Sequence, residues 1–321
     1  MKQVEHLLGY RASIKVMDAT LRDGGLVNDF YFTDEFVKAL YKTNLEAGVD
    51  YMEMGYRASK KVFDETKFGK WKFCSDDHIR EIVGENDTDL KLAIMADIGR
   101  HDKNDFDEKV NSPVDMVRVA AYIHQMPEAI DMIEDAHKKG YETTCNIMAI
   151  SQTQESDLKV ALDMLGKTPV DTIYIVDSFG SIYPEEMKRI VDIYMEAATK
   201  YGKQLGVHAH NNQQLAFANT IEACGDGVNW LDATYKGMGR GAGNCAMELL
   251  LGFLKNPKYN TYPVFRFISD YMVKLEEDGV VWGYDLQYLM TGQLNQHPRA
   301  AIKFTKDKRK DYAEFYKELI V

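Results

Sequence analysis

The stretch Leu205-Gly206-Val207-His208-Ala209-His210-Asn211-Asn212 combines an apolar beginning with two histidines spaced two residues apart. On a β-strand this spacing sends both imidazoles to the same face, where their ring nitrogens can converge on one metal ion. Two core histidines hydrogen-bonded to the backbone would produce the same pattern, so the pair alone does not establish a metal site. A second stretch near the amino terminus, Met17-Asp18-Ala19-Thr20-Leu21-Arg22-Asp23-Gly24-Gly25, supplies the missing carboxylate.

Outward from this stretch, strand-like and helix-like segments alternate along the chain. Thr33 and Gly48 suit the two ends of the first long helix, as its N-cap and its stop. Strands are predicted at 14–18, 51–55, 92–97, 115–122, 142–149, 172–177, the histidine stretch itself and 230–234, and helices at 34–47, 127–139, 156–165, 184–201 and 215–224. Eight strand-then-helix units, each of roughly 25 to 35 residues, indicate a (β/α)8 TIM barrel.

The barrel is predicted to occupy residues 1–255. Residues 256–321 contain three further helical segments rich in aromatic residues, at 265–277, 285–291 and 311–320. This tail is interpreted as a helical extension that packs on the barrel.

Composition excludes several classes of function. The 321 residues carry a formal net charge of −11, which argues against a nucleic-acid-binding surface. No apolar run approaches the roughly 18 residues of a membrane span, and residues 1–6 lack the pattern of a signal peptide. The four cysteines are far apart in the sequence and form no metal-binding or redox pair. A cytoplasmic protein without nucleic-acid or membrane partners is expected.

The barrel fold provides a geometric test of the metal site, because active sites in this fold lie at the carboxyl ends of the strands. Asp23 follows the first strand, His208 and His210 end the seventh, and Asn244 follows the eighth. Closure of the barrel makes these three strands neighbours. An aspartate, two histidines and an amide oxygen suit a divalent cation with open positions better than a closed structural zinc site.

Three motifs in this order resemble the DRE-TIM metallolyase superfamily. They are Asp18-x-Thr20-Leu21-Arg22-Asp23-Gly24, His208-x-His210-Asn211-Asn212 and Gly237-x-Gly239-x-Gly241-Ala242-Gly243-Asn244. The superfamily includes hydroxymethylglutaryl-CoA lyase, isopropylmalate synthase and 4-hydroxy-2-oxovalerate aldolase, and the resemblance extends over residues 14–250.

Within the superfamily the 4-hydroxy-2-oxovalerate aldolase branch fits best. The segments Val117-Arg118-Val119-Ala120 and Ile173-Tyr174-Ile175-Val176-Asp177-Ser178 look like the fourth and sixth strands of that branch. Isopropylmalate synthases continue the first motif with Glu-Gln, whereas this chain has Gly25-Leu26. The lyases carry a reactive cysteine in the loop after strand eight, and residues 237–244 contain none.

The resemblance implies a metal-dependent carbon–carbon lyase that cleaves or forms a bond next to a 2-oxo acid. Mn²⁺ or Mg²⁺ is the expected cofactor, and the expected substrates are a 2-oxo acid and an aldehyde. An aldehyde dehydrogenase is the usual companion of such aldolases, and a homo-oligomer is expected. The metal would act as a Lewis acid. Arg22 would be the second catalytic group that stabilises the enolate, unless it serves only as the ion-pair partner of Asp18 or Glu53.

Other polar residues complete the expected site. Alternation along the fourth strand points Arg118 into the barrel, where it could bind a substrate carboxylate or pair with Glu53. Tyr56 and Tyr122 are placed with Arg118 among the substrate-binding residues. Asn211 and Asn212 are expected to orient the histidine ligands as outer-shell groups. The glycine-rich residues 237–243 lack the Gly-Lys-Ser/Thr of a phosphate loop and are interpreted as a lid.

The sequence departs from the family at the proton-transfer position. The aldolases place a histidine four residues after the motif arginine, and this chain has Leu26 there. Gly283 to Tyr288 looks like the Gly-Tyr-x-x-x-Tyr of the aldolases, so Tyr288 is the first candidate base and His297 the second. Both could instead simply pack the tail onto the barrel, which would leave a metal-bound hydroxide.

Three alternative functions remain open at this point. The first is a Claisen-type acyl-CoA condensing synthase or lyase of the same superfamily. The second is a 2-His-1-carboxylate iron oxygenase, which would use the same ligand types. The third is an inactive, metal-bound partner subunit of a dehydrogenase.

Overall fold

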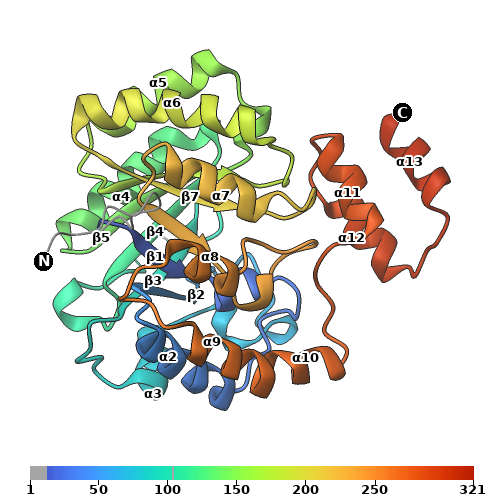
Figure 1. Ribbon diagram of the computed structural model, residues 1–321. Helices are drawn as coiled ribbons and strands as arrows, with labels where there is room; N and C mark the ends of the chain where they lie inside the picture. Colours follow the sequence, from blue (N-terminus) through green and yellow to red (C-terminus); the bar gives the residue numbers. More distant parts are fainter. Residues whose placement is uncertain (1–12, 103–104) are drawn as a thin grey trace, which may run out of the picture.

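The computed structural model of the protein describes residues 13–102 and 105–321. Eight parallel strands close a barrel in chain order, with β8 paired to β1 (Figure 1). The strands are β1 (Lys15–Asp18), β2 (Tyr51–Tyr56), β3 (Lys91–Asp97), β4 (Met116–Ala121), β5 (Glu142–Ile147), β6 (Thr172–Asp177), β7 (Gln204–Ala209) and β8 (Trp230–Ala233). The predicted (β/α)8 barrel is therefore confirmed.

Helices surround the barrel and continue into the carboxyl-terminal tail. Those within the barrel are α1 (Thr20–Gly24), α2 (Asp34–Ala47), α3 (Asp76–Val83), α4 (Met126–Lys138), α5 (Glu155–Gly166), α6 (Pro184–Tyr201), α7 (Ala216–Gly225) and α8 (Met247–Leu254). Those of the tail are α9 (Thr261–Phe267), α10 (Val273–Glu277), α11 (Leu286–Gln293), α12 (Arg299–Lys306) and α13 (Tyr312–Ile320).

Local signals account for the helix ends that the sequence predicts well. The hydroxyl of Thr33 accepts a hydrogen bond from the Phe36 amide and caps α2. Gly48 ends the same helix with φ +73°, a left-handed conformation that favours glycine. Both ends agree with the sequence prediction.

The third unit departs from the predicted strand-then-helix pattern. Within the described residues, only the 3-10 turn η3 (Lys109–Asn111) lies between β3 and β4. Asp102, Asp105 and Asp107 lie in this connection, and aspartate favours turns over helix interiors. Four helices were not predicted: α1, α3, α8 and α12. In α3, Ser75 provides the cap by accepting a hydrogen bond from the His78 amide.

The interior of the barrel is filled in layers. Strand alternation turns seven buried side chains inward as one cluster, separate from the larger core between strands and helices: Met17, Tyr51, Ala93, Met116, Tyr174, Val176 and Trp230. Buried charges accompany this apolar cluster, namely Glu53 of β2, Arg118 of β4 and Asp232 of β8. The histidines of β7 share the inward face and lie at its carboxyl end.

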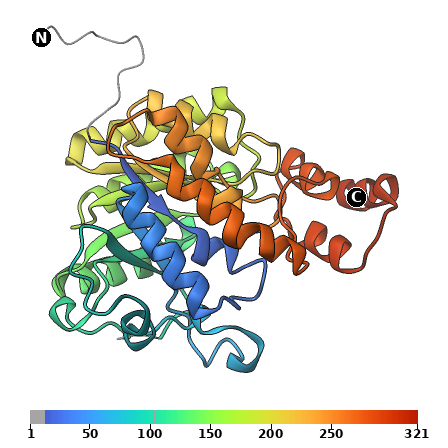
Figure 2. The ribbon, with the colours of Figure 1, turned by 60° about the horizontal axis from the view of Figure 1, so that its bottom comes forward.

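The tail divides into two parts. Helix α9 packs along α2, and its side chains Val264 and Phe267 belong to the main core of the barrel (Figure 2). Helices α11 to α13 stand to one side of the barrel and bury a small core of their own around Ala301, Phe304 and Phe315 (Figure 1). The first part of the predicted extension thus shares the core of the barrel, and a domain boundary at residue 255 stays a prediction.

Few features of the structure bear on the expected cellular compartment. All four cysteines are free and buried. Among the described residues, no helix has the length and apolarity that crossing a membrane requires. Residues 1–6, on which the expectation of no signal peptide rests, lie outside the described part of the chain.

Candidate metal centre and active site

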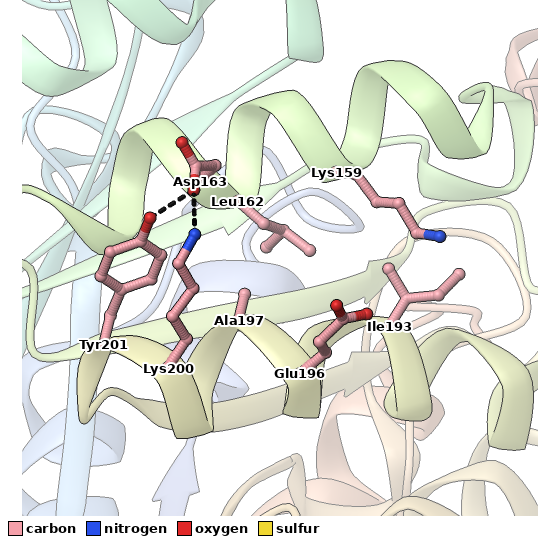
Figure 3. A pocket seen from close by; sticks show the side chains of 8 residues that line it. All are labelled: Lys159, Leu162, Asp163, Ile193, Glu196, Ala197, Lys200 and Tyr201. Atoms are coloured by element: carbon pink, nitrogen blue, oxygen red, sulfur yellow. Dashed lines mark hydrogen bonds and ion pairs between the residues drawn. The ribbon is translucent and has the colours of Figure 1, made fainter.

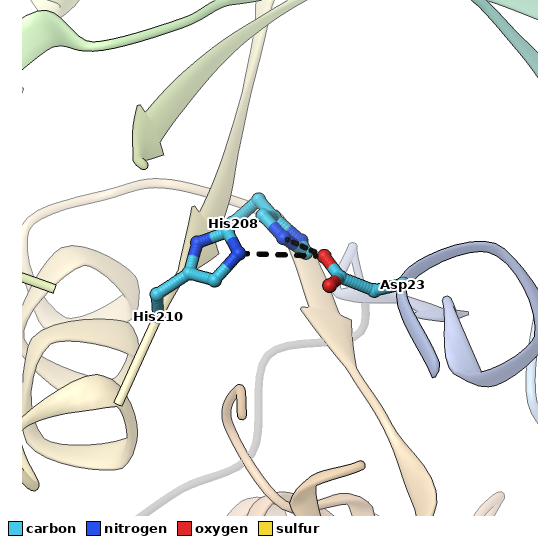
Figure 4. Close-up of side chains that lie close together, drawn as sticks. All are labelled: Asp23, His208 and His210. Atoms are coloured by element: carbon cyan, nitrogen blue, oxygen red, sulfur yellow. Dashed lines mark hydrogen bonds and ion pairs between the residues drawn. The ribbon is translucent and has the colours of Figure 1, made fainter. Parts of the chain in front are cut away.

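Three predicted ligands converge at the carboxyl end of the barrel. Asp23 lies in α1, directly after β1. His208 lies in β7, and His210 is the first residue after β7. The carboxylate oxygen Oδ2 of Asp23 lies 3.0 Å from His208 Nε2 and 3.5 Å from His210 Nε2 (Figure 4). All three side chains are buried, and one ligand atom from each lies within 4.8 Å of the others. This is a suitable arrangement for a bound cation.

The outer nitrogen of each imidazole is fixed by an acceptor. His208 Nδ1 lies 3.0 Å from Asp232 Oδ2, and His210 Nδ1 lies 3.0 Å from the carbonyl oxygen of Asp177. A carbonyl only accepts, so the hydrogen of His210 must be on Nδ1. Burial lowers the pKa of His210 to about 4, so at neutral pH its Nε2 is an unprotonated lone pair that faces the Asp23 carboxylate.

Two of the predicted ligand atoms are buried without a hydrogen-bond partner. They are His210 Nε2 and Asn244 Oδ1. The amide nitrogen of Asn244 donates to the Met238 carbonyl at 3.3 Å, which leaves its oxygen free. A Cβ on Gly239 would meet both Asn244 Nδ2 and Asp23 Oδ1, at 2.1 and 3.1 Å, so the two side chains face the same glycine. Lone pairs buried without donors call for a cation, and these residues fit a divalent metal.

The carboxylate of Asp23 is kept ionised by its neighbours. Burial alone would raise its pKa, but the charge of Arg22 and the two histidines outweigh burial and hold the pKa well below its usual range. Burial and Arg22 would lower the pKa of His208, yet hydrogen bonds to Asp23 and Asp232 raise it. A charged His208 can therefore donate to Asp23 when no cation is bound, whereas metal binding requires the neutral form.

Arg22 is held in place by two carboxylates. Its Nε donates to Glu53 Oε2 at 2.8 Å and its Nη1 to Asp23 Oδ2 at 2.7 Å. Its Nη2 has no hydrogen-bond partner within the described residues, and the side chain lines the central cavity. The ion pair with Glu53 that the sequence allowed is thus present. Asp18, the other partner considered, accepts hydrogen bonds from Thr20 and Asn44 instead.

Arg118 lies beneath the cavity and does not line it. The fully buried guanidinium donates to Glu53 Oε2 at 2.9 Å and to Asp232 Oδ2 at 2.7 Å. Of the two roles considered from the sequence, pairing with Glu53 is the one the structure shows, and substrate contact is not. These contacts close a ring of six side chains in which each touches the next, in the order Arg22, Asp23, His208, Asp232, Arg118 and Glu53.

The predicted outer-shell asparagines do not touch the histidine rings. Asn211 Oδ1 accepts a hydrogen bond from the backbone amide of Ala216, the first residue of α7, and Asn212 Nδ2 donates to the Tyr288 carbonyl. The groups that orient the rings are Asp232 and the Asp177 carbonyl. Asp232 could have been found from the sequence, since alternation along β8 turns it inward beside the histidine strand.

The predicted tyrosines and the two base candidates occupy different places. Tyr56 lines the cavity, whereas Tyr122 stacks on His124 and is not part of the lining. Tyr288 places its hydroxyl 3.4 Å from Thr305 Oγ1, within the tail. The ring of His297 packs on Phe179 at 5.7 Å between centroids. Neither Tyr288 nor His297 lines the cavity, although Leu26 does.

Sequence reasoning missed two cations near the site. Arg240, within the glycine-rich loop, lines the cavity, and its backbone amide donates to Asp23 Oδ1 at 3.0 Å. Lys72 is buried behind Tyr56, with Nζ 4.5 Å from the Tyr56 ring centroid and 4.3 Å from that of Phe63. Burial lowers the pKa of Lys72 to about 8. Arg240 could have been found from the sequence, because it is a basic residue within the glycine-rich segment next to Asn244. No local sequence feature distinguished Lys72.

A further hollow lies on the outside of the barrel, between α5 and α6 (Figure 3). One of its polar lining residues is Asp163, which accepts hydrogen bonds from Lys167, Lys200 and Tyr201. These donors lower the pKa of Asp163, but the side chains involved are largely exposed. Exposed ion pairs of this kind contribute little, and the hollow is remote from the buried ligands.

A buried Asp-His-His cluster lies beside an ion-paired arginine at the carboxyl end of the closed barrel, where active sites of this fold are found. It is therefore a candidate metal site of a barrel enzyme. A family model described as HMGL-like matches residues 13–266. The chain belongs to this HMGL-like family, and the predicted resemblance to the DRE-TIM metallolyases and their 4-hydroxy-2-oxovalerate aldolase branch is confirmed at that level.

Named relatives agree with the family. The chain is 30% identical to a 4-hydroxy-2-oxovalerate aldolase of Thermus thermophilus, over 76% of this chain and 70% of the relative. It is 27% identical to an oxaloacetate decarboxylase of Mycobacterium tuberculosis, over 75% and 69% of the two chains. The solved N-terminal domain of a candidate aldolase from Bacteroides vulgatus superposes with a TM-score of 0.77 and 30% identity, over 91% of this chain and 97% of the other. The expected carbon–carbon lyase thus has support from both sequence and structural relatives.

Proposed function

We propose that the protein is a divalent-metal-dependent aldolase that cleaves or forms a carbon–carbon bond next to a 2-oxo acid. The observation that carries the proposal is the buried cluster of the ionised Asp23 with His208 and His210, directly beside the guanidinium of Arg22, in which the Nε2 lone pair of His210 has no donor. Such a site combines a place for a cation with a fixed positive charge, which is what a developing enolate requires.

The metal would be held by Asp23, His208, His210 and Asn244. A bound divalent ion supplies Lewis-acid stabilisation of negative charge on the oxygens of the oxo acid, and Mn²⁺ or Mg²⁺ suits the mixed nitrogen and oxygen set. Arg22 adds its own charge from a fixed position, because Glu53 and Asp23 restrain its Nε and Nη1 and leave Nη2 free for the substrate.

The cleavage step conserves atoms and electrons as a retro-aldol reaction. A base takes the proton of the hydroxyl on C4, the C3–C4 bond breaks, and C4 becomes the carbonyl carbon of an aldehyde. The electron pair of the broken bond forms the enolate of the oxo acid, whose oxygen lies on C2. Protonation of C3 then releases a pyruvate-type 2-oxo acid. Leu26, Met95, Met148 and Val176 line the cavity and limit water near the enolate.

Proton transfer falls to other groups because Leu26 cannot accept a proton. Burial raises the pKa of Tyr288, so its hydroxyl stays protonated and suits a donor in the condensation direction. Burial and nearby arginines lower the pKa of His297 to about 3, so its imidazole stays neutral and can accept, though as a weak base. Neither side chain lines the cavity, so a role in proton transfer requires it to turn toward the substrate. If Tyr288 or His297 does so, Tyr288→Phe or His297→Ala should change the pH profile of pyruvate release. Full rates with an unchanged profile in both variants would remove the tail from proton transfer.

Decarboxylation is a second candidate activity, favoured by the similarity to an oxaloacetate decarboxylase. Loss of carbon dioxide from oxaloacetate produces the same pyruvate enolate, so the same charges would serve. Acyl-CoA chemistry and iron-dependent oxygenation have no comparable support. A dehydrogenase partner and a homo-oligomer stay predictions.

The proposed function is tested by pyruvate release from 4-hydroxy-2-oxovalerate, with oxaloacetate assayed in parallel. We expect chelation to abolish release and Mn²⁺ or Mg²⁺ to restore it. Asp23→Asn and His208→Ala should lose bound metal, measured by mass spectrometry of the digested protein, while the folded signal by circular dichroism is kept. His137→Ala, on the exposed face of α4, is the matched control. Stoichiometric metal in both site variants would refute the ligand set.

A further inference from the structure

Arg240 is a cation of the active-site cavity for which the aldolase reaction described above has no use. Its guanidinium donates through Nη2 to the Ser178 carbonyl, while its Nε is buried without a hydrogen-bond partner. No carboxylate of the described residues lies within ion-pair distance of this guanidinium. Arg240 is partly buried, and the charge of Asp23 acts on it only from beyond ion-pair distance. A desolvated guanidinium without an ion-pair partner is unfavourable unless a ligand supplies negative charge.

Arg240 is one of three arginines that act on His297, although the chain as a whole carries a net charge of −11. Ser178, which holds Arg240, is followed by Phe179, and the ring of Phe179 packs on His297. Besides burial, the charges of Arg240, Arg299 and Arg100 lower the pKa of His297. Arg100 is paired with Asp97 at 3.4 Å, whereas the side chain of Arg299 has no ion-pair partner in the described part of the chain.

The two ends of the cavity suit different parts of the substrate. Arg22 and the Asp23-His208-His210 cluster suit the oxo-acid end of the substrate, as proposed above. The backbone amide of Arg240 donates to Asp23 and so lies beside the same cluster. Its side chain extends away from there to the carbonyl of Ser178, the residue after β6. An acidic group on the departing half of the substrate would meet a planar guanidinium whose Nε still has a hydrogen to donate.

We propose that Arg240 forms an anion subsite that binds a carboxylate or phosphate carried by the aldehyde half of the substrate. This inference rests on the proposed aldolase function and adds to it the class of aldehyde. Both acidic groups present the same chemistry to a guanidinium, namely two oxygens that share negative charge. Uncharged aldehydes would leave Arg240 without a counter-ion and should be poor substrates.

The test compares condensation of pyruvate with matched aldehydes. Glycolaldehyde phosphate is paired with glycolaldehyde, and succinic semialdehyde with butanal, and the ratio of kcat/KM is measured within each pair. Hydrogen bonds to charged groups correspond to a preference of about 10- to 100-fold for the charged member of one pair. The pair that shows the preference identifies phosphate or carboxylate as the group.

Variants separate the subsite from general damage. Arg240→Met should reduce the ratio to about one, and Arg240→Lys should give an intermediate ratio because a point charge replaces the fork. Lost metal or lost fold would lower both members of a pair together and leave the ratio unchanged. Arg189→Met, which removes an exposed arginine paired with Glu155 on α5, is the control and should keep the wild-type ratio.

Two outcomes would overturn the subsite. One is a wild-type enzyme that condenses both members of each pair equally well. The other is an Arg240→Met variant that keeps the ratio but raises the KM for pyruvate, which would assign Arg240 to the oxo acid itself.

Failure of the proposed function is recognised separately, as the absence of metal-dependent exchange of the pyruvate methyl protons in the wild type. In that case, calorimetry with inorganic phosphate and with succinate still tests the subsite. Binding by the wild type that Arg240→Met lacks would support it, and equal or absent binding would refute it.

Discussion

At the scale of single residues, the site depends on a closed ring of charges rather than on isolated ligands. Arg22, Asp23, His208, Asp232, Arg118 and Glu53 each contact the next, at distances between 2.7 and 3.0 Å. The ring links the expected metal ligands to the arginine expected at the enolate, so neither can move alone. Such preorganisation is what electrostatic catalysis requires, because the charges need no rearrangement during the reaction.

Arg22→Lys should keep the metal and lose most of the activity. An ammonium cannot contact Glu53, Asp23 and the substrate with the geometry of a planar guanidinium. Removal of one such donor costs on the order of 10²- to 10³-fold in rate in other enzymes. Pyruvate release is measured alongside metal content, and near wild-type turnover in a metal-loaded variant would show that Arg22 only supports the fold.

Arg118→Met should destabilise the protein although Arg118 does not reach the cavity. The substitution leaves Glu53 and Asp232 buried without their shared partner, which typically costs about 3–5 kcal/mol. Unfolding in urea measures the loss. Lys15→Met, on β1 with a side chain that is 44% exposed, is a control for removal of a cation from a barrel strand. Equal stability of the two variants would contradict a structural role for the ring.

The sequence identified ligand types but not every partner at this scale. Asp23, His208, His210 and Asn244 were recognisable as candidate ligands because motif and strand position agree. Asn211 and Asn212 are adjacent to the ligands in sequence, yet the chain turns after β7 and carries them to α7 and the tail. Arg118 points inward as alternation predicts, but only the distance across the barrel shows that Asp232 is its second partner.

At the scale of elements, the site is assembled by short connections at one end of the barrel. Asp18 at the end of β1 accepts hydrogen bonds from Thr20 of α1 and Asn44 of α2. Thr20 Oγ1 in turn accepts from the Tyr235 amide, which follows β8. This network joins the segments that carry Asp23 and the glycine-rich loop, and its centre is a buried carboxylate.

The titration of Asp18 should be visible in stability. Burial raises its pKa from 3.8 to about 6, so the folded protein binds the proton more tightly than the unfolded chain. Its contribution to stability is therefore full below pH 4 and is lost as the pH rises to about 6, by up to about 3 kcal/mol.

Asp18→Asn removes this titration, so the stability difference between wild type and variant should fall between pH 4 and 6. Unfolding in urea across this range is the measurement. A constant offset from altered hydrogen bonds would not affect the slope, and a difference independent of pH would contradict the assignment.

The glycine-rich loop is predicted to tolerate no side chain at Gly239. A Cβ there would lie 2.1 Å from Asn244 Nδ2 and 3.1 Å from Asp23 Oδ1, so Gly239→Ala must displace one of the two. We expect metal affinity to fall by about 10- to 100-fold, as for substitutions next to ligands in other metal sites. Gly252→Ala in α8 meets nothing within 4 Å and serves as the control. Equal metal affinity in both variants would show that Asn244 is not a metal ligand.

Periodicity predicted most elements, and the failures have local causes. The strands and long helices were found because buried strands and amphipathic helices repeat with different periods. Helix α3 is short, and α12 lies in a charged segment, so neither has a clear repeat. The predicted helix at 265–277 is continuous in space but contains a π-helical turn at Ile268–Met272, which no sequence signal announced.

At the scale of the whole molecule, the barrel supplies the charge ring and the tail covers part of its mouth. Tyr288 of α11 lies against the glycine-rich loop, since a Cβ on Gly241 would be 3.1 Å from its ring. Asn295 anchors the tail through hydrogen bonds with Ser151 and Ser181 on the barrel. The tail therefore packs on loops at the carboxyl end of the barrel, an assembly that could not be read from the sequence alone.

The central claim is that this assembly stabilises the enolate of a 2-oxo acid through a bound divalent cation. Exchange of the pyruvate methyl protons in deuterated water tests it most directly, because exchange needs the enolate but no aldehyde. We predict incorporation of deuterium by the wild-type enzyme with Mn²⁺ or Mg²⁺, measured by mass spectrometry, and none after chelation or in Asp23→Asn. Absence of exchange in a wild-type enzyme that carries stoichiometric metal, or equal exchange in the chelated enzyme, would contradict the claim.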